Sequence, residues 1–215
     1  MTSKLRINEV FYSLQGESIH TGYPTIFIRL SGCPLRCTYC DTEYAFHGGQ
    51  WQTTEQIVTN IRQFNTLYVC VTGCEPLAQP SVHGLMDMLV EKGYHVSLET
   101  SGALDISTVN SAVTIVMDLK TPSSGEQSKN LLSNIDHLSV TDVLKFVIGT
   151  QEDYDWAVAV CERYQLTTKV ASVFFSACFE LMSPTVLAEW ILRDQLTVRF
   201  QLQLHKYLWG DKPGH

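Results

Sequence analysis

Residues 25–42 read TIFIRLSGCPLRCTYCDT and join a β-strand pattern to a cluster of cysteines. The segment 25–31 is rich in apolar and β-branched residues, which predicts a buried strand. A loop follows this strand, and its first residues include Cys33, Cys37 and Cys40. Functional residues in α/β proteins gather where strands end, so this junction is the first candidate site.

The rest of the chain alternates short apolar segments with amphipathic ones. Apolar or alternating runs predict further strands at residues 5–12, 67–72, 94–99, 113–118, 143–148, 169–175 and 197–204. A helical period predicts helices at residues 53–64, 81–92, 151–165 and 184–194, and the cysteine-containing loop covers 32–50. Strands that alternate with helices indicate a parallel sheet covered by helices.

The number of strand–helix units limits the architecture. About six such units are too few for a closed eight-stranded barrel, and the polar stretch 119–142 has no clear helical period. We therefore expect an α/β fold in which residues 1–215 form a single domain. The expected architecture is a partial, open β/α barrel of about six mostly parallel strands with a reduced set of helices, and its site should lie at the carboxyl ends of the strands.

Composition and charge exclude several classes of function. Apolar residues form 45% of the 215-residue chain and the net charge is −7, so the basic surface of a sequence-independent nucleic-acid binder is not expected. No apolar run reaches the length of a membrane span, and the first residues contain no apolar signal-peptide core. We therefore expect a cytoplasmic protein with no membrane association and no direct nucleic-acid partner.

The spacing C-x₃-C-x₂-C suits a four-iron cluster. Three thiolates can hold three irons of a [4Fe–4S] cluster, and no fourth cysteine lies near them, because the next is Cys70. The fourth iron would then be open to the amino and carboxylate groups of S-adenosylmethionine (SAM), a carrier of radical chemistry. Two alternatives remain open. One is a zinc site completed by His47, as in a zinc-binding interaction domain, and the other is three free buried cysteines.

The three cysteines, with Tyr39 before the last of them, resemble the motif of the radical SAM superfamily. Thr72-Gly73-Cys74-Glu75-Pro76 resembles that superfamily's Gly-Gly-Glu-Pro turn, with Cys74 in place of the second glycine. The resemblance implies a [4Fe–4S] cluster and SAM as cofactors, and we predict that Cys74 is not a cluster ligand. With the help of this resemblance, the SAM contacts are inferred to be Tyr39, Cys40, Asp41, Gly73, Glu75, Gly102, Lys145 and Ser176.

Further motifs resemble the 7-carboxy-7-deazaguanine synthase family within that superfamily. They are Ser13-Leu14-Gln15-Gly16-Glu17-Ser18, Arg29, Cys40-Asp41-Thr42, Glu99-Thr100-Ser101-Gly102 and Gln203-Leu204-His205-Lys206, and they cover nearly the whole chain. The resemblance implies a lyase that converts 6-carboxy-5,6,7,8-tetrahydropterin to 7-carboxy-7-deazaguanine with loss of ammonia, on the route to queuosine. It also implies Mg²⁺, an electron donor of the flavodoxin or ferredoxin type, and a homodimer.

The side chains in these motifs suit the roles that the resemblance implies. Arg29 offers a fixed pair of donors for a carboxylate, which the substrate carries, although an ion pair with Glu17 is the alternative. Glu17 can accept hydrogen bonds from a guanidine-like edge, and Thr42 can give Mg²⁺ one oxygen. The implied substrate contacts are Leu14, Gln15, Gly16, Glu17, Arg29, Thr100 and His205, and no side chain is assigned a chemical step of its own.

Two rival functions remain at this point. The first is another small radical SAM activity, chiefly a glycyl-radical-enzyme activase, which acts on a protein backbone. The second is the zinc-binding interaction domain, which is not an enzyme. The Gln15-Gly16-Glu17 segment and Arg29 favour a small carboxylated substrate over the first rival, and metal content separates the second.

Overall fold

The computed structural model describes residues 3–210, 212 and 214. Its strands are β1 (Lys4–Leu14), β2 (Pro24–Leu30), β3 (Gln50–Thr53), β4 (Tyr68–Gly73), β5 (His95–Thr100), β6 (Thr114–Asp118), β7 (Val143–Ile148), β8 (Ser172–Ala177) and β9 (Arg199–Gln201). The helices are α1 (Thr54–Ile61), α2 (Val82–Glu91), α3 (Gln151–Tyr164), α4 (Leu166–Lys169), α5 (Pro184–Arg193) and α6 (Leu204–Trp209).

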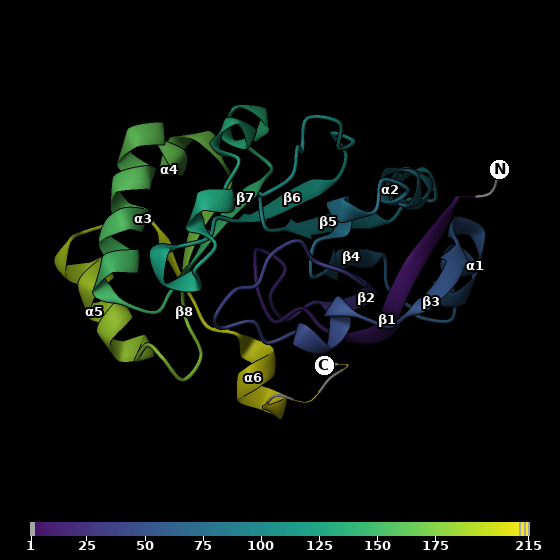
Figure 1. The fold of residues 1–215 in the computed structure, drawn as a ribbon, viewed down its shortest axis with the longest axis horizontal. Helices are drawn as coiled ribbons and strands as arrows, with labels where there is room; N and C mark the ends of the chain where they lie inside the picture. The colour runs from purple at the N-terminus through teal and green to yellow at the C-terminus, as the bar shows by residue number, and fades with distance from the viewer. Residues whose placement is uncertain (1–2, 211, 213, 215) are drawn as a thin grey trace.

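All of these strands belong to one sheet (Figure 1). Its order is β3-β1-β2-β4-β5-β6-β7-β8-β9, with every pair from β2 to β9 parallel. β1 runs antiparallel to both of its neighbours. Among the described residues β3 and β9 are edge strands, so the sheet stays open. The prediction of an open, mostly parallel α/β sheet is confirmed, with seven parallel strands in place of about six.

The two faces of the sheet carry different residues because side chains alternate along a strand. In β7, Leu144, Phe146 and Ile148 pack into the main hydrophobic core with the helices. The intervening Val143 instead packs with Val116, Phe174 and Ile19 on the opposite, inner face. Because the helices cover the other face, the inner face is the one on which polar side chains can line a site near the carboxyl ends of the strands.

Helices are few, and those that form have clear local signals. Thr53 caps α1 in a capping box with Gln56, and Pro184 occupies the first turn of α5. Among the described residues no α-helix lies between β5 and β6, and only short 3₁₀ turns connect β6 to β7. This confirms the reduced helix set that the polar stretch 119–142 indicates.

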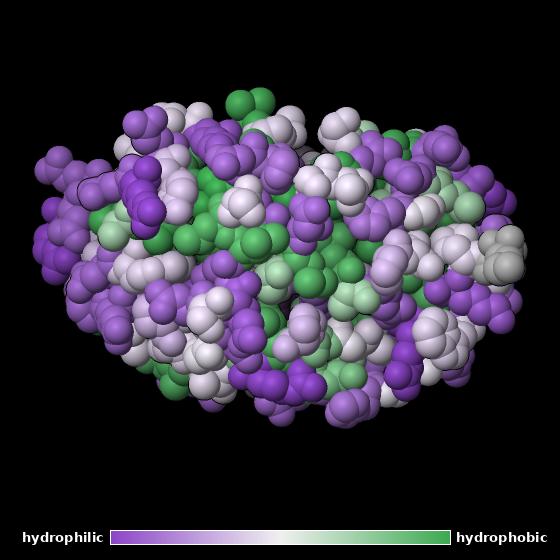
Figure 2. Space-filling model, turned by 45° about the horizontal axis from the view of Figure 1, so that its top comes forward, coloured by the Kyte–Doolittle hydropathy of each residue, from purple (hydrophilic) through white to green (hydrophobic). Residues whose placement is uncertain are grey.

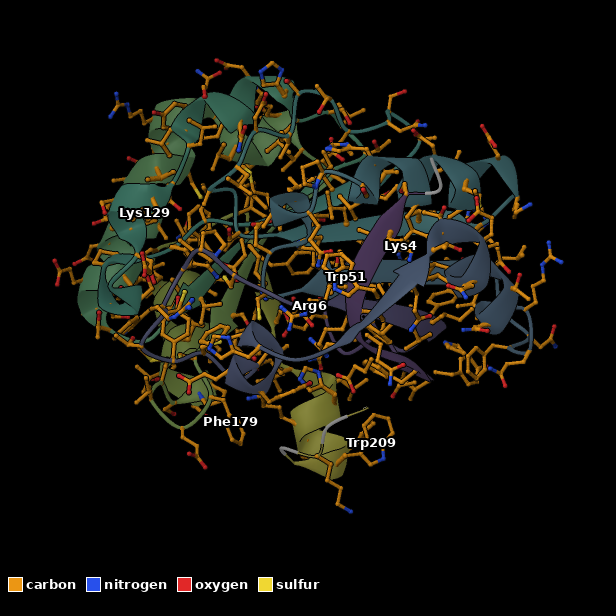
Figure 3. The ribbon with its side chains drawn as sticks, turned by 45° about the vertical axis from the view of Figure 1, so that its right-hand side comes forward. Lys4, Arg6, Trp51, Lys129, Phe179 and Trp209 are labelled. Carbon is orange, nitrogen blue, oxygen red and sulfur yellow. The ribbon has the colours of Figure 1, made fainter. Side chains whose placement is uncertain are left out.

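Three predicted elements were wrong in type or extent. Residues 50–53, of which 50 was expected in the cysteine loop and 53 at the start of a helix, form β3 by pairing with the first residues of β1. Figure 3 shows Arg6 and Trp51, which are cross-strand partners in this pair, close together. Only β9 forms within the strand predicted at 197–204, and Leu204, the last residue of that prediction, instead begins α6. The strand predicted at 169–175 starts only at Ser172, after the short helix α4.

The segment from Gln15 to Tyr23, here called the strap, crosses from β1 to the far edge of the sheet. Leu204 N donates to Gly16 O (3.0 Å), and Gln201 Nε2 donates to Ser18 O (3.4 Å). Ile19 covers the inner face of β6, β7 and β8. The strap therefore links the first and last parts of the open sheet and brings Gln15-Gly16-Glu17 onto its inner face.

The surface is mixed in character. Figure 2 shows hydrophobic side chains gathered across the middle of one face, with mostly polar side chains toward both ends. None of the helices in the described part of the chain combines the length and the apolar composition needed to cross a bilayer.

Candidate active site

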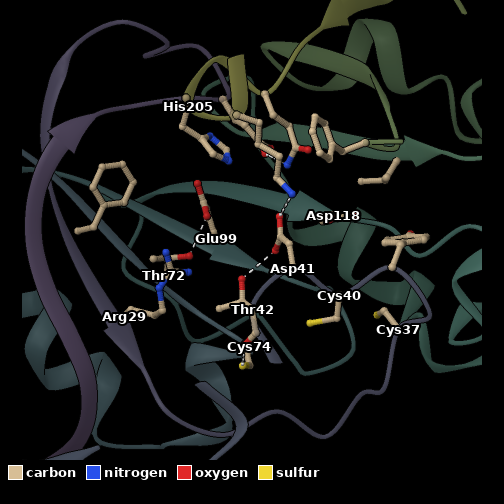
Figure 4. Close-up of a pocket in the computed structure, with 18 of the residues that line it drawn as sticks. Arg29, Cys37, Cys40, Asp41, Thr42, Thr72, Cys74, Glu99, Asp118 and His205 are labelled. Atoms are coloured by element: carbon tan, nitrogen blue, oxygen red, sulfur yellow. Dashed lines mark hydrogen bonds and ion pairs between the residues drawn. The ribbon is translucent and has the colours of Figure 1, made fainter. Parts of the chain in front are cut away.

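A row of polar side chains crosses the inner face, one from each of five neighbouring parallel strands. They are Arg29, Thr72, Glu99, Asp118 and Lys145, on β2, β4, β5, β6 and β7, and all line one cavity of about 270 Å³. Register aligns Arg29 with Thr72 and Asp118 with Lys145. Thr72 Oγ1 donates to Glu99 Oε2 at 2.8 Å. Figure 4 shows Arg29, Thr72 and Glu99 on one side of this cavity.

The cysteine loop forms another wall of the same cavity. Cys33, Cys37 and Cys40 are free thiols, half-buried, and line the cavity together. A hydrogen bond with the Cys74 thiol lowers the pKa of Cys33 to about 7, and burial raises the pKa of Cys37 to about 11. Tyr39, on the same loop, also lines the cavity.

Asp41 connects the cysteine loop to α6. Its Oδ2 lies 3.1 Å from Lys206 Nζ, and its Oδ1 accepts a hydrogen bond from Thr42 Oγ1 at 2.8 Å. Burial alone would raise the pKa of Asp41, but the Lys206 ammonium outweighs it together with the Thr42 hydrogen bond, so this pKa falls to about 2. Asp41 is therefore ionised at neutral pH, and it holds Thr42 at the cavity wall.

Glu17, on the strap, is the centre of a buried charge network. Lys145 Nζ lies 2.5 Å from Glu17 Oε2, and Gln203 Nε2 donates to Glu17 Oε1 at 2.7 Å. Lys145 also lies 3.6 Å from Asp118 Oδ2, which pairs with Lys120 Nζ at 3.0 Å. The partner of Lys145 in the structure is thus Glu17, and Glu17 does not pair with Arg29, whose carboxylate partner is Glu9.

Gly16 is a glycine because His205 lies against it. A Cβ built on Gly16 would come 2.1 Å from Nδ1 of His205 and 3.1 Å from the backbone N of the same residue. Real Cβ atoms do not approach other atoms so closely, so any side chain at this position must displace His205. The close contact keeps the imidazole at the cavity wall, where Leu14 and Gln15 also lie.

Gly16→Ala should therefore weaken ligand binding in this cavity while leaving the fold intact. Displacing His205 is an overpacking change with a cost of about 1–3 kcal/mol, and it moves a cavity side chain rather than the core. Equilibrium titration of the substrate, once identified, should show about tenfold or greater loss of affinity. Gly84→Ala is the matched control, because a Cβ there meets nothing within 4 Å. Unchanged affinity in Gly16→Ala would contradict the role given to this contact.

The Gly73-Cys74-Glu75 turn is built around a buried carboxylate. Glu75 is fully buried and accepts hydrogen bonds from Thr100 Oγ1 (2.9 Å), Leu77 N (3.1 Å), and the backbone N and hydroxyl of Ser101. The carboxylate therefore ties the end of β4 to the end of β5.

Within this turn the backbone requires glycine at position 73, not at 74. Gly73 has φ +142°, and a Cβ there would lie 2.5 Å from Leu30 O. Cys74 is absent from the described residues that have positive φ, so a cysteine in place of the expected second glycine causes no backbone strain. Its thiol lies 3.7 Å from Thr42 O and lines the cavity.

The structure brings most of the predicted site residues to one cavity. Those that line it are Leu14, Gln15, Gly16, Glu17, Arg29, Cys33, Cys37, Tyr39, Cys40, Asp41, Thr42, Lys145 and His205. Those that it does not place on the cavity wall are Gly73, Glu75, Thr100, Gly102 and Ser176. Thr100 and Gly102 instead belong to the Glu75 hydrogen-bond network, since Gly102 N donates to Thr100 Oγ1.

Several cavity residues were missed as site residues by sequence reasoning. They are Thr72, Glu99, Asp118, Lys120, Gln203 and Lys206. Asp118 ends a predicted strand, and Glu99 ends the next one toward the amino terminus. Both directly follow a buried apolar residue at the end of a strand, so the strand-end rule could have found them.

The donor set fits an iron–sulfur cluster and a polar ligand beside it. Three free thiols face one cavity, which suits thiolate ligation of iron, whereas His47 is exposed and does not line the cavity. No group of three His, Cys, Asp or Glu side chains among the described residues is already arranged as a metal site. Asp118 Oδ1 is buried without a hydrogen-bond partner in this part of the chain, so it can accept from a bound ligand.

The sequence of this chain is similar to a known superfamily and to several named enzymes. The family model described as "Radical SAM superfamily" matches residues 27–165. A 7-carboxy-7-deazaguanine synthase from Koribacter versatilis is 40% identical, with 95% of this chain and 97% of the relative covered. One of the same name from Chlorobaculum tepidum is 41% identical, with 96% and 94% covered.

Solved structures show the same architecture. The crystal structure of QueE from Escherichia coli matches with a TM-score of 0.78 and 23% identity, and covers 94% of this chain and 95% of that one. At this identity the match bears on the fold alone. It agrees with the open parallel sheet and the few helices seen in Figure 1.

Proposed function

Because this chain belongs to the radical SAM superfamily and, within it, to the 7-carboxy-7-deazaguanine synthase family, we propose that it contracts the ring of 6-carboxy-5,6,7,8-tetrahydropterin. The product would be 7-carboxy-7-deazaguanine, with loss of ammonia, in 7-deazapurine biosynthesis. The relatives carry this name over nearly the full length of the chain. The activase and zinc-module alternatives have no comparable support.

One observation carries the proposal. The three free thiols form one wall of the cavity, and the Arg29 guanidinium and the Glu17 carboxylate lie on its other walls. A carboxylated pterin needs a cationic donor pair for its carboxylate and an acceptor for its guanidine-like N–H edge. Both groups are present in the same cavity as the thiols.

The roles of the residues follow from their positions. Cys33, Cys37 and Cys40 would hold the cluster, which together with SAM supplies the radical chemistry of the superfamily. Arg29 would bind the substrate carboxylate and Glu17 the guanidine-like edge, while Lys145 keeps Glu17 ionised. Thr100 and Glu75 would act from behind the cavity wall, through the turn that they brace.

We extend the SAM site to residues that the inner face supplies. Asp118 Oδ1 has an unused acceptor position at the cavity, and SAM carries ribose hydroxyls and an amino group that can donate to it. Burial raises the pKa of Tyr39, so this phenol stays neutral at the cavity wall. Tyr39, Asp41 and Asp118 are the polar groups that we propose for SAM.

Magnesium is a further part of the proposal. Thr42 lines the cavity, and its hydroxyl donates to Asp41, which leaves an oxygen lone pair for a cation. Mg²⁺ often takes one or two protein oxygens and completes its shell with substrate oxygens and water. The substrate carboxylate would be such an oxygen source.

Incubation of reduced, reconstituted protein with SAM, Mg²⁺ and carboxytetrahydropterin tests the assignment. We expect 7-carboxy-7-deazaguanine and ammonia, identified by mass spectrometry and an ammonia assay. Cleavage of SAM without the deazapurine would contradict the proposed substrate while leaving the superfamily assignment in place. The related uncarboxylated tetrahydropterin serves as the substrate control.

Cys74→Gly should leave cluster content and turnover largely unchanged. Three loop thiols suffice for a cluster with one open iron, and Cys74 comes from a different element, β4 and its turn. Its loss removes the weak hydrogen bond to Thr42 O and the hydrogen bond to the Cys33 thiol. Iron and sulfide analysis of the anaerobic variant should match the wild type, and loss of the cluster would make Cys74 a ligand.

Partners and location are the remaining proposals. Several large apolar side chains around β9 and α6 are exposed, namely Phe179, Phe200, Leu202, Tyr207 and Leu208. Figure 3 shows Phe179 and Trp209 on this side of the molecule. We propose that this region forms a homodimer contact, which light scattering would test.

A flavodoxin- or ferredoxin-type electron donor and a cytoplasmic location are also proposed, because both suit a protein with seven free thiols.

A further inference from the structure

The guanidinium of Arg29 is held by two residues that the proposed chemistry does not use, Glu9 and Tyr44. Arg29 Nε donates to Glu9 Oε1 at 2.7 Å, and Tyr44 OH donates to the same oxygen at 2.7 Å. The guanidinium carbon lies 5.5 Å from the ring centre of Phe11 and 6.0 Å from that of Tyr44. One carboxylate oxygen and two rings therefore fix its position.

A β-bulge places Glu9 in this arrangement. Ile7 pairs with Leu30, and both pack into the core with the helices. In a regular strand Glu9, two residues later, would share the face of Ile7. The register shifts between them, so that Glu9 pairs with Arg29 on the inner face. The extra residue, Asn8, thus turns Glu9 to the inner face beside Arg29, which is a common use of bulges beside active sites.

The contacts leave the terminal amino groups of Arg29 for a ligand. In the described part of the chain, the hydrogen bonds of Arg29 involve only Nε. Arg29 lines the cavity, and its side chain is 15% exposed there. An arginine binds a carboxylate best through two parallel N–H groups in a fixed orientation. Holding Nε in the free protein reduces the side-chain entropy that is lost when the carboxylate binds.

Tyr44 also connects this arrangement to the cysteine loop. It belongs to the 3₁₀ turn η1 (Glu43–Phe46), which follows Cys40-Asp41-Thr42 directly. Its hydroxyl donates to Glu9 Oε1, the same oxygen that accepts from Arg29 Nε. The order of the loop that carries the thiols is thereby coupled to the position of Arg29.

We propose that Glu9 and Tyr44 are positioning residues that hold Arg29 for the substrate carboxylate and so set the preference for a carboxylated pterin. The inference rests on the proposed function, since it takes Arg29 as the carboxylate-binding group. Glu9 acts through Arg29 Nε, and Tyr44 acts through Glu9 and through its ring. Neither needs to touch the substrate.

Glu9→Gln and Tyr44→Phe test the proposal, with Glu91→Gln as the matched control because Glu91 is exposed at the end of α2. Binding of carboxytetrahydropterin and of uncarboxylated tetrahydropterin is measured by equilibrium titration without reductant, so that no turnover is needed. Glu9→Gln should weaken binding of the carboxylated pterin about tenfold, and Tyr44→Phe about threefold, with binding of the uncarboxylated pterin unchanged. In turnover KM should rise more than kcat falls, at wild-type iron content.

A double-mutant cycle separates positioning from a structural role. If Glu9 acts through Arg29, Glu9→Gln should cost nothing further in an Arg29→Gln background. Equal weakening of both pterins, or additive losses, would overturn the proposal and make Glu9 a structural residue. Wild-type protein that neither binds nor converts the carboxylated pterin would overturn the proposed function, and the inference with it. Wild-type activity with an unaffected Glu9→Gln variant would overturn the inference alone.

Discussion

Cys37→Ala protein, purified and reconstituted without oxygen, is expected to be colourless and to retain almost no iron. The wild type should bind about four irons per chain, because three loop thiolates hold three irons and the fourth stays open. Cys37 lies between the other two ligands on one short loop, and the cavity offers no thiol within that loop to replace it. Two thiolates cannot keep a four-iron cluster against dissociation.

Iron and sulfide analysis and the visible absorbance of thiolate-to-iron charge transfer measure this effect. Cys161→Ala is the control, since Cys161 lies on α3 and is not part of the cavity wall. That variant should keep its iron and lose at most a little stability. If Cys37→Ala keeps iron and activity, the ligand assignment is wrong, and Cys74 becomes the first candidate for the third ligand.

The strand pattern made much of this site predictable. Arg29, Thr72, Glu99 and Asp118 each stand near the carboxyl end of a short strand, and Lys145 interrupts an apolar one. A period of two puts those side chains on the same face, and parallel pairing puts them at the same end. Roles for Arg29 and Lys145 were expected with the help of the family resemblance, and strand periodicity would have added Thr72, Glu99 and Asp118.

Other features depend on contacts between residues distant in sequence, which no local pattern encodes. The bulge that turns Glu9 toward Arg29 exists only in the pairing of β1 with β2. The close approach of His205 to Gly16 joins the strap to α6, nearly the full length of the chain away. β3 is only four residues long and takes its strand form by pairing with β1, so its own sequence gives little signal.

Lys145→Met should destabilise the cluster-free protein by about 3–5 kcal/mol, because it leaves a buried carboxylate without its counter-ion. Lys145 Nζ lies 2.5 Å from Glu17 Oε2, and the side chains are 16% and 13% exposed. Gln203 still donates to Glu17, but a neutral amide does not offset the loss of an ammonium. Asp118, the other partner of Lys145, keeps Lys120.

The stability loss caused by Lys145→Met should depend on pH, in a direction set by the pKa of Glu17. In the wild type burial raises the pKa of Glu17, but Lys145 outweighs it, so the folded-state pKa lies below its ordinary value of 4.5. The stability that this pair contributes is present above pH 4.5 and is lost as pH falls through the lowered pKa. Without Lys145 burial prevails and should raise the pKa of Glu17 above 4.5, so the variant binds a proton more readily when folded. The stability difference between wild type and variant should therefore be largest near neutral pH and shrink as pH falls.

Urea unfolding of cluster-free protein across this pH range, followed by circular dichroism, would measure the difference. Lys169→Met is the control, because its partner Asp136 is 81% exposed and such pairs contribute about 0–1 kcal/mol. Adding Glu17→Gln to Lys145→Met should recover much of the lost stability, since it removes the buried charge, but should not restore turnover if Glu17 accepts the pterin edge. A stability loss that is independent of pH, or that Glu17→Gln fails to relieve, would show that Lys145 serves packing rather than the charge of Glu17.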